Sequence, residues 1–132
     1  MDDARVALVG HCGPDAYALR AAVRSMFPRG EVQMVSDASE LEAEIPAADL
    51  LLVNRILDGE FEVDSGIELI RVLAALPARE RPALMLVSNF PEAQAEAQGA
   101  GALPGFGKKQ MYSAEMRKNM EAAVAARRAL KG

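Results

Sequence analysis

The feature that most constrains this chain is a short apolar run that ends on a polar amide, Asp49-Leu50-Leu51-Leu52-Val53-Asn54. A run of this length, closed by polar and glycine residues, is typical of a strand buried on both faces of a sheet. Similar apolar runs occur at residues 6–9 and 83–87. Together they favour an open parallel sheet, in which ligands gather beyond the carboxyl ends of the strands.

The segments between these runs carry helix signals. Pro14 and Asp15 suit the first turn of a helix that runs to about residue 26. Its apolar positions at helical spacing are Tyr17, Ala18, Ala21, Ala22 and Met26, with Leu19 and Val23 beside them. Further helices are predicted over residues 37–45, 66–76, 92–98 (closed by Gly99) and 114–130, and further strands over residues 32–35 and 102–106.

This alternation predicts the fold class. Strands that alternate with helices imply parallel strands joined by right-handed crossovers, with helices on both faces. We therefore expect one α/β domain over residues 1–132. Its predicted architecture is a three-layer, doubly wound, flavodoxin-like parallel sheet of about five strands with about five helices.

Composition and charge narrow the range of partners. The chain has 132 residues, a formal net charge of −4 and one cysteine. A negative balance argues against a broad nucleic-acid or membrane footprint, which would need a basic face. One cysteine forms no internal disulfide, and no apolar run reaches the roughly 18 residues of a membrane span. We expect a cytoplasmic domain that binds neither nucleic acid nor membrane.

Four local motifs follow one another along the chain. They are the run that ends on Asn54, the glycine-led helix start Ser65-Gly66, the run that ends on Ser88, and Lys108 seven residues after Gly101. This order and spacing resemble the receiver domains of response regulators, which act in two-component signal transduction and phosphorelay systems. In that resemblance, Asn54 stands at the phospho-accepting Asp, Ser88 at the switch Thr or Ser, and Lys108 at the family's Lys.

The same resemblance implies that the family's chemistry has been lost. Receivers use a carboxylate nucleophile and a divalent metal held by an acidic pair after the first strand. Here these positions read Asn54 and Gly10-His11-Cys12. An amide has no anionic oxygen to attack a phosphoryl group, and the carboxylate oxygens that Mg²⁺ prefers are missing. We therefore expect an atypical receiver (a pseudo-receiver) with no catalytic residue, no cofactor and no bound Mg²⁺.

Smaller departures surround this site. Lys109 replaces the family's Pro, so that Lys108 and Lys109 compete for the lysine position. The aromatic switch position falls on Gly105, one residue before Phe106. The loop over residues 55–65 is longer than the roughly two to six residues of a usual strand-to-helix turn.

Each candidate side chain has a purely structural interpretation beside its functional one. Asn54 either hydrogen-bonds Lys108 and Ser88 in a neutral polar cluster or ends a strand at a turn. Ser88 is either a switch hydroxyl or part of the turn before Pro91. Lys108 either donates to Asn54 or to a bound anion, or it is a solvated surface lysine.

Other residues near this cleft have weaker functional interpretations. His11 and Cys12 offer a soft metal two ligands, fewer than a structural site needs, and a lone cysteine in such a fold is usually inert. Asp58, Glu60 and Asp64 either supply a displaced carboxylate or are simply solvated, which is the favoured interpretation. The sequence Gly10-His11-Cys12-Gly13 lacks the further residues of a nucleotide-binding loop.

Two functions of different class follow. The first is a module that docks a partner protein, or a second copy, without Asp phosphorylation. The resemblance implies that it docks through the last helix and the neighbouring face, where exposed methionines would suit adaptable packing. The second is a working phospho-acceptor or small-ligand site built from non-standard groups in the same cleft.

The last helix has an apolar stripe, most of which we expect to pack on the sheet. Its members are Met116, Met120, Ala123, Val124 and Leu130. Arg127 and Arg128 are expected off this stripe, where they would complement the C-terminal end of the helix dipole.

Overall fold

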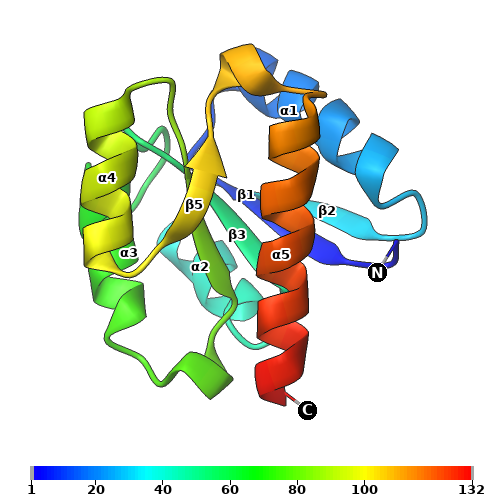
Figure 1. Ribbon diagram of the computed structural model, residues 1–132. Helices are drawn as coiled ribbons and strands as arrows, with labels where there is room; N and C mark the ends of the chain where they lie inside the picture. Colours follow the sequence, from blue (N-terminus) through cyan, green and yellow to red (C-terminus); the bar gives the residue numbers. More distant parts are fainter. Residues whose placement is uncertain (1, 132) are drawn as a thin grey trace.

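A parallel sheet forms the middle layer of the structure, a computed structural model that describes residues 2–131. Its strands lie in the order β2-β1-β3-β4-β5 (Figure 1). They are β1 (Arg5–Val9), β2 (Glu31–Val35), β3 (Leu50–Asn54), β4 (Ala83–Val87) and β5 (Leu103–Phe106). The chain runs from β1 to one neighbour and returns to the other, so a topological switch point lies between β1 and β3.

Helices cover both faces of the sheet (Figure 1). They are α1 (Gly13–Met26), α2 (Ala38–Glu44), α3 (Gly66–Ala74), α4 (Pro91–Ala100) and α5 (Ala114–Lys131), with 3₁₀ turns η1 (Ala78–Glu80) and η2 (Lys108–Gln110). One apolar core lies between the sheet, α1 and α5, and the other between the sheet, α2, α3 and α4. The predicted three-layer, flavodoxin-like fold is confirmed.

The central strand β3 explains why the apolar run is uninterrupted. Leu50 and Leu52 belong to the core under α1 and α5, while Leu51 and Val53 belong to the opposite core. All four side chains are fully buried. Full burial of one such side chain contributes about 1.5–3 kcal/mol, so both faces of the strand must be apolar.

The buried face of α1 differs from the predicted one. Tyr17 is 76% exposed, whereas Ala16 and Leu19 are buried. The buried set recurs at helical spacing and consists of Ala16, Leu19, Ala22, Val23 and Met26. The apolar ring of Tyr17 suggested a core position, but the geometry of the helix turns it to solvent.

Two helix ends also differ from expectation. Helix α3 ends at Ala74 rather than near residue 76, and α4 continues through Gly99 to Ala100. The residue that caps the C-terminus of α4 is Gly101, which has a φ of 122°. A Cβ there would lie 2.5 Å from the Cβ of Ala74, so this position suits only glycine.

Helix α5 begins at its predicted cap, because Ser113 Oγ accepts a hydrogen bond of 3.0 Å from the Met116 N–H. Met116, Met120, Ala123 and Val124 are buried, as predicted, but Leu130 is 43% exposed. No helix among residues 2–131 is long and apolar enough to cross a membrane.

Of the two arginines near the end of α5, Arg127 does not lie where the sequence placed it. Arg127 belongs to the buried face, only 3% exposed, and donates to the Arg79 carbonyl at 2.9 Å. Arg128 forms ion pairs with Asp3 and Asp49. Both guanidinium groups therefore hold separate parts of the chain together. The prediction that Arg127 lies off the apolar stripe is wrong, whereas Arg128 lies in the last turn of α5 and off its buried face, as predicted.

Candidate functional site

The predicted site residues meet beyond the carboxyl ends of the strands. Asn54 is the last residue of β3, Ser88 directly follows β4, and Lys108 begins η2 after β5. All three line one cavity of about 250 Å³. The sequence therefore identified three residues that the fold brings together.

Asn54 has a different role from the predicted polar cluster. Its Nδ2 donates to the Gly10 carbonyl at 3.1 Å and to the Ile56 carbonyl at 2.8 Å. Among residues 2–131, neither Lys108 nor Ser88 is a hydrogen-bond partner of Asn54. The amide instead ties the end of β1 to the first residues of the long loop, because both of its hydrogens are donated to backbone oxygens.

The long loop, residues 55–65, crosses the tips of β1 and β2. The Asp58 N–H donates to the Gly10 carbonyl at 2.9 Å. Glu60 then pairs with the segment after β2, donating to Ser36 O at 2.8 Å and accepting from Ala38 N at 3.0 Å. These backbone bonds fix the extra residues of the loop over the carboxyl ends of β1 and β2.

An apolar side chain covers the first residue after β1. Gly10 has φ of 74°, and a Cβ built on it would lie 2.6 Å from Leu57 Cδ2. Leu57 is half-buried and packs against the core on the α2–α3–α4 side. By resemblance to receivers, the acidic pair would begin at Gly10; here this position has no side chain and lies under a leucine.

His11 faces into the protein. Its Nε2 donates to the Leu52 carbonyl at 2.9 Å, while Nδ1 is buried without a hydrogen-bond partner among residues 2–131. Burial lowers the pKa of His11, and its bond to Leu52 only partly opposes this. Within the described chain, no three His, Cys, Asp or Glu side chains group as metal ligands.

Lys108 pairs with an acid that the sequence had assigned only to a helix dipole. Its Nζ forms an ion pair with Asp15 in the first turn of α1. The hydrogen bond from Lys108, assisted by the Cys12 thiol, holds the pKa of Asp15 below its usual value. Lys109 is exposed and its backbone N–H donates to Asn89 Oδ1 at 3.1 Å, so Lys108 is the lysine of the cleft.

Ser88 makes a turn contact. Its Oγ accepts a hydrogen bond of 3.1 Å from the Phe90 N–H, two residues on. This is the local turn that the sequence offered as an alternative to a switch hydroxyl. A switch role for Ser88 stays a prediction.

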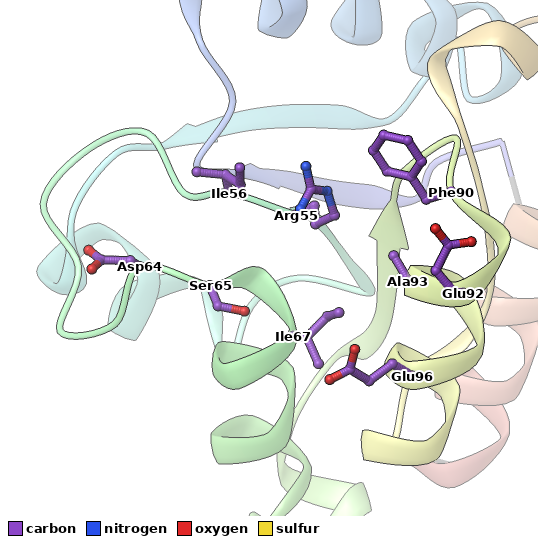
Figure 2. Close-up of a pocket in the computed structure, with 9 residues that line it drawn as sticks. All are labelled: Arg55, Ile56, Asp64, Ser65, Ile67, Phe90, Glu92, Ala93 and Glu96. Atoms are coloured by element: carbon purple, nitrogen blue, oxygen red, sulfur yellow. The ribbon is translucent and has the colours of Figure 1, made fainter.

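A larger cavity of about 650 Å³ adjoins this cleft (Figure 2). The Arg55 guanidinium lies 5.0 Å from the centre of the Phe90 ring, at a distance typical of a cation–π contact. The side chains of Glu92 and Glu96 come from α4, and that of Asp64 from the end of the long loop. Sequence analysis missed the Arg55–Phe90 contact because the two residues lie on different loops.

The loop carboxylates do not replace the missing acidic pair. Asp58, Glu60 and Asp64 are all exposed, in agreement with the favoured prediction that these loop carboxylates are solvated. Asp64 lines the larger cavity, and Asp58 lines another cavity beside α1 and the end of β2. The carboxylate next to Lys108 is that of Asp15.

Comparison with known proteins identifies the fold. No family model matches this sequence, and no curated protein matches it. Its structure is similar to the signal receiver domain of a DNA-binding response regulator from Colwellia psychrerythraea, with a TM-score of 0.71, 13% identity, and coverage of 93% of this chain and 99% of that one. The fold is that of a receiver domain.

Two further solved structures support the receiver fold. The receiver domain of NtrX from Brucella abortus is 20% identical, with a TM-score of 0.62 and coverage of 96% and 98% of the two chains. The chemotaxis response regulator CheY4 of Vibrio cholerae is 15% identical, with a TM-score of 0.64 and coverage of 92% and 98%. This chain also spans 28% of a longer NtrX chain.

Proposed function

We propose that this chain is an atypical receiver domain that acts in signal transduction by binding a protein, without phosphorylation of an Asp. The observation that carries the proposal is the state of Asn54. At the end of β3 it presents an amide, which forms no acyl phosphate, and both amide hydrogens are bound to the Gly10 and Ile56 carbonyls. The position serves as a structural anchor for the loop.

The residues present do not fit the divalent metal that the receiver fold implies. Mg²⁺ prefers carboxylate oxygens in octahedral geometry. Gly10 has no side chain, His11 is bound to the Leu52 carbonyl, and the Asp15 carboxylate is paired with Lys108. We therefore derive no phosphoryl-transfer step for this site, and we propose that it needs no cofactor.

The proposed docking surface is the face formed by α4, β5 and α5. A groove of about 480 Å³ runs there, and its exposed polar lining includes Gln98, Lys109 and Glu115. The methionines of α5 in the apolar stripe are buried, so the expected exposed methionines are not part of this helix surface. The groove instead offers polar donors and acceptors to a partner.

The experiment that tests the proposal is incubation of the protein with acetyl phosphate and Mg²⁺, followed by intact mass measurement. A receiver with a carboxylate at the nucleophile position is the positive control. We expect no covalent phosphoryl adduct. A stoichiometric adduct that hydroxylamine removes would identify an acyl phosphate and overturn the proposal.

A further inference from the structure

Two arginines lie together at the end of the sheet opposite Asn54. Arg81 directly follows η1, two residues before β4 begins, and Arg127 belongs to the last turns of α5 and contacts η1. Helix α5 ends beside this end of the sheet (Figure 1). Both line a small cavity of about 150 Å³. Arg127 is 3% exposed, while Arg81 is half-buried.

In the part of the chain that the structure describes, the hydrogen-bond acceptors of these two guanidinium groups are all backbone carbonyl groups. Arg127 Nη1 donates to Arg79 O at 2.9 Å and more weakly to Ala78 O at 3.4 Å. Arg81 donates to the carbonyls of Leu76 and Pro82, both at 3.3 Å. Among residues 2–131 neither guanidinium has a carboxylate partner, and Arg127 Nε is buried without any acceptor.

This arrangement is electrostatically incomplete. A buried charge is costly unless an opposite charge compensates it, and here two like charges lie close together. Burial, and after it the positive charge of Arg127, lowers the pKa of Arg81. An anion in the cavity would offset both effects, because it would face the two guanidinium groups at once.

The walls of the cavity indicate which anion fits. Apart from the arginines it is lined mainly by apolar groups, among them Leu84, Leu103 and Leu130. Leu130 is 43% exposed and marks the side open to solvent. A guanidinium matches the two oxygens of a carboxylate, and leucine side chains match a short hydrocarbon tail.

We propose that this cavity binds the carboxylate of a ligand that carries a short apolar tail. Such a carboxylate comes either from a small organic acid or from the C-terminus of a peptide. The site lies at the opposite end of the sheet from the Asn54 cleft and uses none of its residues. Its test is therefore independent of the test of phosphorylation.

The experiment is an NMR titration of the whole protein with sodium butyrate, with ionic strength held constant by sodium chloride. We expect saturable shifts at the amides of residues 78–84 and 126–130. Butyramide, which has the same shape without the charge, is expected to give no saturable shift. Arg81→Gln is expected to weaken butyrate binding at least about tenfold, because one of two charge-assisted contacts is lost.

The matched control is Arg79→Gln. It removes the same charge from an exposed side chain in the same turn, so butyrate affinity is expected to stay within about twofold of the wild type. Arg127 is deeply buried and its replacement threatens folding, whereas Arg81 makes only two long hydrogen bonds. The Arg81 variant is therefore expected to fold, so that a loss of butyrate binding can be assigned to the loss of its charge.

Three results would overturn the proposal: no saturable shift with butyrate, equal binding of butyramide, or equal losses in the Arg79 and Arg81 variants. A tetrapeptide that ends in leucine, compared with its C-terminally amidated form, separates the two sources of carboxylate. Tighter binding of the free-acid peptide than of butyrate identifies a peptide C-terminus as the ligand. The reverse order identifies a small organic acid.

Discussion

Replacing Asn54 by Asp restores the residue type that the receiver family uses, yet we expect it to destabilise this protein. At neutral pH a carboxylate donates no hydrogen bond, so the contacts to Gly10 O at 3.1 Å and Ile56 O at 2.8 Å are lost. The new negative charge would also face these two carbonyl oxygens. The structure therefore predicts that the change opens the anchored end of the long loop.

The magnitude follows from the two lost bonds. A neutral hydrogen bond contributes about 0.5–1.5 kcal/mol, and a buried carbonyl left without a donor costs about 1–3 kcal/mol. Asn54 is half-buried, so water replaces part of the lost donation. We expect Asn54→Asp to lower the free energy of unfolding by about 2–3 kcal/mol at pH 7.

Urea unfolding at pH 7 measures this loss, since small single domains usually unfold in one cooperative step. The matched control is Asn89→Asp. Asn89 is exposed and accepts from the Lys109 N–H through Oδ1, a role that a carboxylate keeps. This control is expected to change stability by no more than about 0.5 kcal/mol.

The pH dependence of the Asn54→Asp variant provides a second check. Below the pKa of the new carboxyl, the protonated group again donates one hydrogen, so the deficit relative to wild type is expected to shrink as pH falls. A variant as stable as the wild type at pH 7 would refute the argument that the amide hydrogens of Asn54 hold the loop.

Three further predictions concern the same cleft. Gly10→Ala is expected to lower the free energy of unfolding in urea by about 1–3 kcal/mol, because Gly10 has a positive φ and a Cβ there would contact Leu57. The double variant that also carries Leu57→Ala should lose less stability than the sum of the two single variants. Strict additivity of the two losses would contradict the contact. The pKa of His11 is lowered in the folded state, so its contribution to stability is present above the unfolded pKa of about 6.5 and is lost as pH falls below it. His11→Gln is therefore expected to flatten the stability profile below about pH 6.5, and an unchanged slope would exclude this role. Lys108→Met should raise the pKa of Asp15 toward its usual value in a carbon-detected NMR titration, and no change would mean that the ion pair does not form in solution.

The order of elements and the strand ends were predictable because burial leaves a direct mark on sequence. Strand β3 is buried on both faces and therefore reads as an unbroken apolar run. Asn54, Ser88 and Lys108 were located because they follow strand ends that meet at one edge of a parallel sheet. Topology alone brings these three together.

The contacts made by the same residues were not predictable. The long loop is held by backbone bonds, such as Asp58 N to Gly10 O, which any residue types could form. Sequence spacing did not link Asp15 with Lys108, because the two residues lie far apart along the chain. The fold alone brings them to one ion pair.

Arg127 did leave a signal that the residue type obscured. It lies three and four residues after Val124 and Ala123, on the same helical face. A charged residue is rarely fully buried, so the charge of Arg127 predicted a surface position. Its spacing from Ala123 and Val124 predicted a position in the core. Here the spacing was correct, because backbone carbonyls near η1 accept from the guanidinium.

The central claim is that the cleft at Asn54, Ser88 and Lys108 does not bind a phosphoryl group with magnesium. An NMR titration with beryllofluoride, a phosphoryl mimic, in the presence of Mg²⁺ tests it most directly. We predict no saturable shift at the amides of these three residues, because the cleft offers no carboxylate to the mimic and no fitting ligand set to the metal. Saturable shifts at all three residues that require both Mg²⁺ and beryllofluoride would contradict the claim.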